Sequence, residues 1–148
     1  SGVKYPRVRS ISMSQAFAKG EWLDGSVGSS QTKWRTYNKL SNIVLPAKTF
    51  VFVEEHPDSI NDAAFATQMT SNQLTDPQSA ARIIDVPASF HNGACGFSFA
   101  DGHAEIHKWK GMKIQPAVKY NNNLTLNYAA GDAWLDAHWL AEMTTVRN

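Results

Sequence analysis

Hydrophobic and polar residues alternate along two short segments that meet at Asp101-Gly102 and together cover residues 94–109. Alternation with a period of two is typical of a β-strand with one buried face. An Asp-Gly pair between two such segments favours a type I′ turn, because both central residues of that turn need a positive φ. The pattern therefore predicts a β-hairpin over residues 94–109 with a two-residue turn.

A two-residue turn also determines which residues of the two strands oppose one another. In this register one face of the hairpin is apolar and is expected to belong to the core; it consists of Phe97, Phe99, Ala104 and Ile106. The other face is small and polar; it consists of Gly96, Ser98, Ala100, His103, Glu105 and His107. Cys95 lies on the apolar side, which indicates a small buried hydrophobic residue rather than a reactive thiol.

Other segments predict the elements around this hairpin. Residues 49–55 are β-branched and aromatic at successive positions, which is typical of a central strand buried on both faces. Gly131 and Asp132 can start a C-terminal helix that docks on the sheet. The residues expected on one face of this helix are Trp134, Leu135, His138, Trp139 and Met143.

Weaker patterns predict the remaining elements. Residues 3–13 and 82–87 indicate short strands, and residues 33–45 indicate a helix of one or two turns, because aromatic and apolar residues recur three positions apart. Residues 20–32 and 119–131 are rich in Gly, Ser or Asn and are expected to form partner-facing loops, the first of them mobile.

These elements predict one α+β domain over residues 1–148: a small antiparallel sheet around the Asp-Gly hairpin, rich in loops, with a C-terminal helix packed on the sheet. The chain is long enough to bury a core of its own. The residues expected to form this core are Phe50, Phe52, Phe97, Phe99, Ile106, Trp134 and Trp139.

Composition argues against several classes of function. The 148 residues carry a formal net charge of +1, so the chain lacks the strong positive charge with which proteins bind nucleic acid or anionic membranes. No run of about 18 apolar residues is present, so no membrane contact through a spanning helix is expected. Cys95 is the single cysteine, so no internal disulfide can form.

His103, Glu105 and His107 occupy alternate positions of the second hairpin strand, so their side chains share one face. Imidazole and carboxylate groups bind zinc, copper, nickel or iron, and the three residues are a candidate transition-metal site. Neighbours on one strand face lie about 6.5–7 Å apart, so a single ion would need a further ligand such as His91. The alternative is a polar face covered by solvent or by a loop.

A second candidate ion site follows the central strand. Its carboxylates are of the kind that calcium prefers, and they belong to Glu54, Glu55, Asp58 and Asp62. Their spacing is not that of an EF-hand loop, and the alternative is that Asp58 caps a turn or helix over residues 59–69. The sequence thus requires no cofactor, and calcium or a transition metal ion are the candidates it offers.

The chain is not expected to be an enzyme. It has residue types that hydrolysis uses, among them Ser98 and His91, but no nucleophile elbow, phosphate loop or zinc-protease signature. Tryptophan side chains could instead stack on sugar rings. Trp22 and Trp34 lie in or beside the Gly/Ser-rich loop and are the candidates for contact with a polysaccharide.

His91, nine further residues and then Asp101-Gly102 resemble the C-terminal processing-associated motif, H-X9-DG, of prepilin-type proteins. These proteins are pseudopilins of type II secretion-like systems, of the planctomycete and verrucomicrobial type. Further segments resemble successive blocks of the same family in the same order; with the motif, they are residues 7–13, 34–41, 52–62, 87–109 and 136–145.

The resemblance implies an architecture. In that family a long N-terminal hydrophobic helix with the prepilin-peptidase site precedes a small α+β head with an antiparallel sheet. This chain lacks such a helix, so we expect the head domain of a protein that is anchored by a helix upstream of Ser1; the alternative is a divergent secreted relative. Within the motif, Gly102 would permit the turn, Asp101 would favour it and His91 would anchor the strand that enters it. Some major pseudopilins bind calcium, which adds weight to an ion in this chain.

The expected function is therefore that of a non-enzymatic assembly subunit, the head of a type II secretion-like pseudopilin or surface fibre. Its location would be the periplasm, the cell envelope or the exterior of a bacterial cell. Its partners would be other pilin-like subunits or components of a secretion system. The alternative is an extracellular carbohydrate-binding or carbohydrate-active protein that is built on a pilin-like head and could depend on a metal.

Overall fold

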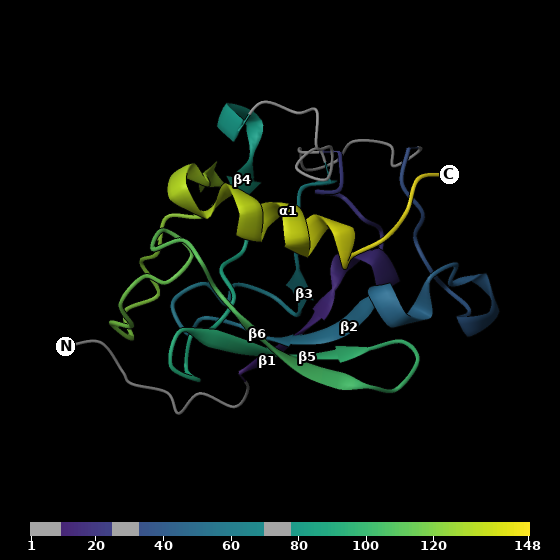
Figure 1. The fold of residues 1–148 in the computed structure, drawn as a ribbon, viewed down its shortest axis with the longest axis horizontal. Helices are drawn as coiled ribbons and strands as arrows, with labels where there is room; N and C mark the ends of the chain where they lie inside the picture. The colour runs from purple at the N-terminus through teal and green to yellow at the C-terminus, as the bar shows by residue number, and fades with distance from the viewer. Residues whose placement is uncertain (1–9, 25–32, 70–77) are drawn as a thin grey trace.

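The computed structural model describes residues 10–24, 33–69 and 78–148. Within these residues the fold is α+β, as predicted, with a five-stranded sheet of order β3-β1-β2-β5-β6, a two-stranded sheet and one α-helix (Figure 1). The larger sheet is antiparallel except where β1 pairs with β3. Its strands are β1 (Ile11–Ser14), β2 (Phe50–Glu54), β3 (Ala64–Phe65), β5 (Ala94–Phe99) and β6 (Ala104–Lys108).

The C-terminal helix covers one face of this sheet, as predicted. Gly131–Ala133 form a 3₁₀ turn that leads into α1 (Trp134–Glu142), so the helical segment begins at the expected Gly131. Leu135 is 42% exposed and points away from the sheet, although the helical spacing placed it on the packed face. The reason is that a nine-residue helix on a sheet buries a narrow stripe, here occupied by residues such as Ala137 and Leu140.

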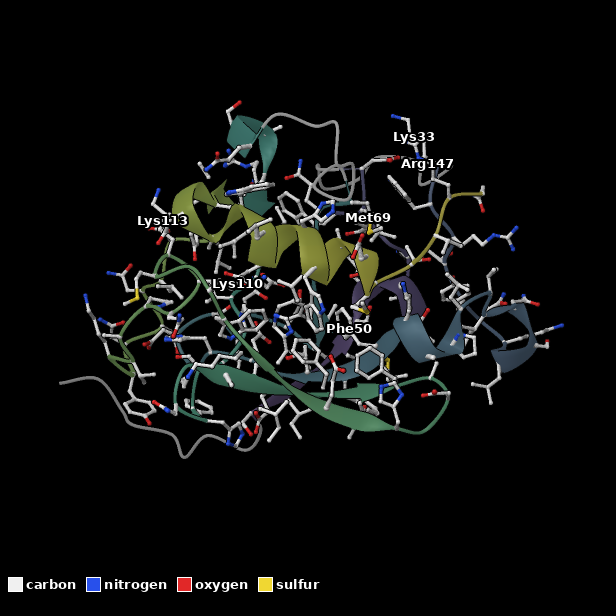
Figure 2. All side chains as sticks on the ribbon, viewed as in Figure 1. Lys33, Phe50, Met69, Lys110, Lys113 and Arg147 are labelled. Carbon is white, nitrogen blue, oxygen red and sulfur yellow. The ribbon has the colours of Figure 1, made fainter. Side chains whose placement is uncertain are left out.

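An aromatic cluster between α1 and the sheet forms the centre of the core. The Phe97 ring lies 5.0 Å from that of Trp139 and 5.4 Å from that of Phe50, both in edge-to-face geometry. Phe50 lies between α1 and the strands in Figure 2, and Phe99 is also buried. The predicted core is thus confirmed for the residues of β5, for Phe50 and for the helix contact.

The predicted register of the hairpin is wrong by one residue. Phe97 opposes Glu105 and Ser98 opposes Ala104, whereas a two-residue turn would place Phe97 opposite Ile106. The loop has three residues, because Phe99 N donates to His103 O, and it ends with Gly102 at φ +95°. A slip of one residue turns every β6 side chain to the other face, so Ile106 lies outside the predicted core.

Phe52 also lies outside the predicted core. An irregularity between Phe50 and Phe52 in the β2–β5 pairing adds one residue to β2. Phe50 and Val53 therefore both face α1, while Phe52 is 43% exposed on the other face. The central strand is buried on one face, not on two as its composition suggested.

Of the elements that the weaker patterns predicted, one is present, one is absent and two lie partly outside the described residues. Residues 33–45 do not form the expected helix; they contain a bridge from Trp34 to Arg147 and a 3₁₀ turn at Leu40–Asn42. The strand expected over residues 82–87 is present as β4 (Arg82–Ile83), which pairs with β7 (Tyr128–Ala129) inside the second expected loop. The strand expected over residues 3–13 and the loop expected over residues 20–32 lie partly outside the described residues.

Candidate functional site

Strand β1 has an inverted distribution of polar and apolar side chains. Ser12 and Ser14 are buried, while Ile11 is 52% and Met13 is 39% exposed. The two serines have internal hydrogen-bond partners: Ser12 Oγ donates to the Glu55 carboxylate, and Ser14 Oγ accepts from a backbone N–H in the following turn. The apolar side chains of β1 therefore lie on the sheet face opposite α1, which we call the open face.

Neighbouring strands extend this apolar surface. Phe52 lies beside Met13 on β2, and Ile106, which is 66% exposed, lies on β6. Between them β5 contributes the small residues Gly96 and Ser98. Together these side chains form a groove of about 650 Å³ on the open face. We call it the sheet groove; its open-face residues are Ile11, Phe52, Glu54, Gly96, Ser98, Ala104 and Ile106.

The dimensions of the sheet groove suit an elongated apolar partner such as a helix. It extends over β1, β2, β5 and β6, and its two walls, on β2 and β6, are two strand spacings of about 4.8 Å apart, or roughly 10 Å between strand axes. Its floor at Gly96, Ser98 and Ala104 is low, and its two sides carry the bulkier Phe52 and Ile106. An α-helix with side chains is about 10–12 Å across, so a helix that lies along the groove places one row of its side chains between these walls. Chemically, such a surface binds by excluding water from apolar groups.

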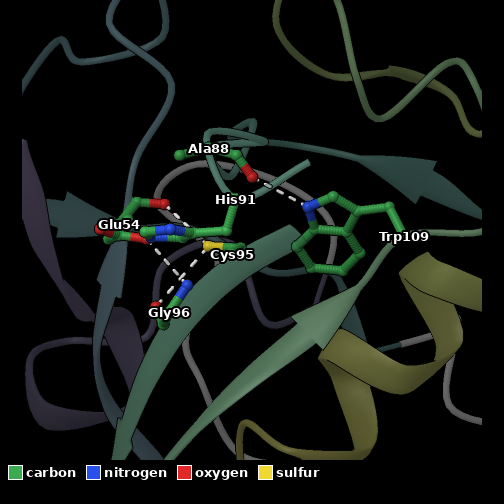
Figure 3. Close-up of polar contacts among 6 residues, drawn as sticks. All are labelled: Glu54, Ala88, His91, Cys95, Gly96 and Trp109. Atoms are coloured by element: carbon green, nitrogen blue, oxygen red, sulfur yellow. Dashed lines mark hydrogen bonds and ion pairs between the residues drawn. The ribbon is translucent and has the colours of Figure 1, made fainter. Parts of the chain in front are cut away.

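One end of the sheet groove is organised by Glu54. Its Oε2 atom accepts hydrogen bonds from His91 Nε2 and from the backbone N–H of Gly96, each at 2.8 Å (Figure 3). A Cβ atom at Gly96 would lie 3.1 Å from that same oxygen, which is tighter than ordinary contact. Because Gly96 has no Cβ atom, the groove floor is low at this position and the Glu54 carboxylate can approach the backbone closely.

The segment that carries His91 is held against β2 by further contacts. Ala88 N donates to the backbone oxygen of Glu54 at 2.8 Å. Figure 3 shows the second bond, in which the indole N–H of Trp109 donates to Ala88 O at 2.8 Å. Cys95 is fully buried beside them, and its thiol donates to Glu54 O. The prediction of a buried core residue is confirmed, and this burial raises the pKa of Cys95.

The motif residues occupy opposite ends of β5. His91 precedes the strand and bonds to Glu54, whereas Asp101 and Gly102 follow it. The Asp101 carboxylate accepts from His103 Nδ1 at 2.6 Å and from His103 N at 3.2 Å, and these hydrogen bonds lower the pKa of Asp101. The motif is therefore two local structures, one at each end of a strand, and not one cluster.

The acidic residues proposed as calcium ligands do not converge. Glu54 lies on the open face, while the buried Glu55 carboxylate accepts from Ser12 and Ser59. The carboxylate of Asp62 accepts from the N–H of Ala64 in its own loop. Each carboxylate has partners of its own.

Asp58 is bound by a distant loop. Its carboxylate accepts four backbone hydrogen bonds at 2.7–3.1 Å, from Lys119, Tyr120, Asn121 and Asn122. Burial raises its pKa, but these bonds outweigh burial and lower the pKa to about 2. The Asp58 carboxylate thus caps residues 119–122, and not the segment that the alternative expected, residues 59–69, which contains β3.

The three residues proposed as a transition-metal site lie on the α1 side of β6, as a consequence of the corrected register. The His103 ring stacks on Phe99 with centroids 4.3 Å apart, and the His107 ring stacks on Trp139 at 3.6 Å. Burial lowers the pKa of His107, which favours its neutral form. Across residues 10–24, 33–69 and 78–148, no three His, Cys, Asp or Glu side chains are grouped so that they could hold a metal ion. Both ion sites therefore stay predictions.

The tryptophans proposed for sugar stacking differ in exposure. Trp34 is only 4% exposed, and the Arg147 guanidinium lies over its ring at 5.1 Å. Trp22 is half-buried, and its backbone N–H donates to the side-chain oxygen of Gln15. Neither residue lines the sheet groove, and polysaccharide binding stays a prediction.

Sequence reasoning missed the sheet groove. Ile11 and Met13 alternate visibly with two serines, but apolar residues in a strand are normally assigned to the core. The buried Glu55 carboxylate that bonds to Ser12 lies 43 residues further along the chain, so no local signal in the sequence could have reversed the assignment. Phe52 and Ile106 were missed because a bulge and a one-residue register shift changed their face.

Comparisons with protein-family models, with curated proteins and with solved structures return no match to this chain. Within the described residues, no helix has the length and apolar character needed to cross a membrane.

Proposed function

We propose that this chain is the head of a non-enzymatic, pilin-like assembly subunit, of the kind found in type II secretion-like systems or surface fibres. The observation that carries the proposal is the sheet groove, an apolar surface that spans four strands and is left open by α1. Proteins in solution seldom leave such a surface uncovered, and it marks a site of interaction. The resemblance of the His91 and Asp101-Gly102 region to pseudopilins agrees with this role.

The proposed occupant of the sheet groove is an apolar helix of the same subunit, encoded upstream of Ser1. Ile11 lines the groove and is the first residue of β1, so chain that precedes β1 enters the fold at the groove itself. Nine residues precede Ser10, and an extended segment of that length spans up to about 30 Å. A helix further upstream could therefore reach any part of the groove.

Small residues on the groove floor support a helix rather than a flat partner. Gly96, Ser98 and Ala104 let a helix backbone approach closely, and Phe52 and Ile106 flank it on both sides. The subunit would then be placed in the cell envelope or outside the cell, with other pilin-like subunits or secretion components as its partners. No catalytic step and no cofactor is part of this proposal.

The first test is the reading frame upstream of Ser1. An apolar helix of about 20 residues with a prepilin-peptidase site is expected there. A start codon within a few residues of Ser1, or an unrelated soluble domain in its place, would contradict the proposal.

The second test is binding of a synthetic peptide with the sequence of that upstream helix to the ¹⁵N-labelled chain. Amide resonances of Gly96, Ser98 and Ala104 should shift on titration. Ser98→Lys places a charged chain on the groove floor and should weaken binding at least tenfold. The matched control is Ala47→Lys, which adds the same charge at an exposed turn whose residues do not line the groove and should leave binding unchanged.

A further inference from the structure

The outer edge of β6 has backbone groups available for pairing. β6 is the last strand of the sheet, and its odd-numbered residues bond to β5, as in the pairs Phe99–His103 and Gly93–Trp109. Residues of opposite parity in an antiparallel ladder direct N–H and C=O away from the partner strand. The backbone groups of Ala104, Ile106 and Lys108 therefore point outward, and in the described part of the chain no hydrogen bond to them is recorded.

This edge lacks three of the devices that protect a sheet from further pairing, namely a proline, a bulge and a very short strand. β6 is five residues long and pairs with β5 without a register shift, and its charged side chains are Glu105 and Lys108. The opposite edge, β3, has only two residues. Ala104, Glu105 and Ile106 are all exposed, so a strand could approach β6 without displacing their side chains.

We infer that β6 pairs with β6 of a second copy of this chain, antiparallel, around a two-fold axis at Ile106. Ile106 is the midpoint of the strand, so this register pairs all five residues and exchanges about six backbone hydrogen bonds. It places Glu105 opposite His107 of the other copy, an acceptor opposite a hydrogen-bond donor. Moving the axis to Glu105 would instead place the two Glu105 carboxylates opposite one another, which is unfavourable.

The same pairing makes the two open faces continuous. The side chains of both Ile106 residues would meet on that face, and two sheet grooves would lie side by side in one ten-stranded sheet. The inference goes beyond the proposed function, since it concerns the strand edge and holds whatever occupies the groove. In an assembly, the β6–β6 pairing would form a lateral contact between two head domains.

Cysteine cross-linking tests the register. Opposed residues in a hydrogen-bonded antiparallel pair have Cα atoms about 5.5 Å apart, within the range of a disulfide. Ile106→Cys should therefore yield a covalent dimer under mild oxidation. Ala104→Cys is the matched control, because the two Ala104 residues would be offset by four residues, or about 13 Å along the strand, in addition to the separation of the strands. Adding Lys108→Cys to Ala104→Cys should restore the dimer, and the buried Cys95 is common to all variants.

Sedimentation equilibrium of the unmodified chain tests association itself. The weight-average mass should rise with concentration from 16.4 kDa towards twice that value. Ile106→Pro removes an outward N–H without breaking the β5 ladder, and it should abolish the rise while the far-UV spectrum is retained. A monomer at every concentration, or equal cross-linking of Ile106→Cys and Ala104→Cys, would overturn the inference. If the chain stays monomeric because β6 pairs with a different protein, the inference that β6 pairs with a second copy of this chain is equally contradicted.

Discussion

Glu54 and His91 are joined by a 2.8 Å hydrogen bond that connects β2 to the segment entering β5, 37 residues further along the chain. The motif histidine thus has a structural partner outside the motif. The same Glu54 oxygen accepts from Gly96 N, so one carboxylate organises both the entry to β5 and one end of the sheet groove.

We expect Glu54→Ala to destabilise the fold more than His91→Ala. The His91 side chain is 45% exposed, and an exposed ion pair contributes about 0.2–1 kcal/mol. Loss of the carboxylate also leaves the half-buried Gly96 N–H without its acceptor, which costs about 1–3 kcal/mol. Urea denaturation measures both free energies of unfolding. Glu105→Ala, an exposed control, should change stability by less than about 0.5 kcal/mol, and a larger loss for His91→Ala than for Glu54→Ala would contradict the assignment.

Asp58 should make the stability of the protein fall in acid. Its folded pKa of about 2 lies below the ordinary value of 3.8, so the folded state favours the ionised carboxylate. The stabilisation is complete above pH 4 and is lost as the pH falls through 2. Asp58→Asn should remove this part of the pH dependence and should destabilise the fold by about 1–3 kcal/mol at pH 7.

Thermal unfolding of Asp58→Asn between pH 2 and pH 7 checks this expectation. Glu142→Gln, which removes an exposed carboxylate from the end of α1, serves as control and should retain the acid-dependent loss. If Asp58→Asn kept the full slope between pH 4 and pH 2, the four backbone bonds would not be its source.

Asp85 should have the opposite effect. Burial raises its pKa to about 7, while Ala66 N donates to its carboxylate at 2.7 Å, and the nearby Glu55 and Asp62 raise the pKa further. The folded state therefore holds the proton that the unfolded chain releases near pH 4, so this contribution is full below pH 4 and is lost as the pH rises to 7.

Asp85→Asn keeps an oxygen for Ala66 N and cannot ionise. The variant should be more stable than the parent at pH 8 by a few kcal/mol, and the two should converge near pH 4. Chemical denaturation at both pH values measures the difference. A variant that is equally destabilised at both pH values would show that the side chain acts through packing and not through ionisation.

Gly111 is expected to tolerate substitution less well than Gly102. A Cβ atom at this position would lie 2.3 Å from Ala133 Cα, so backbone at the start of α1 would have to move. Gly111→Ala should cost about 3 kcal/mol or more. Gly102→Ala is the matched comparison, since nothing lies within 4 Å of its added carbon and only the φ of +95° opposes it, at about 1–2 kcal/mol. A reversed order in urea denaturation would contradict the close approach.

Local patterns in the sequence determined the elements with strong periodicity. The hairpin within residues 94–109 follows from alternation and turn residues, and the C-terminal helix from Gly131 follows from helical spacing. The strand within residues 49–55 follows from its β-branched and aromatic composition. These signals lie within a few residues of one another, so no distant contact is needed to read them. The burial of Phe97, Phe99 and Cys95 could be predicted on the same grounds.

Tertiary contacts decided which face each strand presents. Ala100 N donates to Thr49 O of the neighbouring segment, which keeps Ala100 in line with β5 and extends the turn to three residues. That one residue turned Ile106 outward and brought His107 against Trp139. The bulge in β2 exposed Phe52 in the same way.

The candidate site depended on these decisions. The sheet groove exists because four strands present apolar or small side chains on one face, and the register of each strand is set by its neighbours. Asp58 and Glu54 likewise find their partners in segments far along the chain. The sequence by itself determined the elements, through short-range periodicity, and only the tertiary structure determined the open face, because strand pairing and bulges act between residues that no local pattern connects.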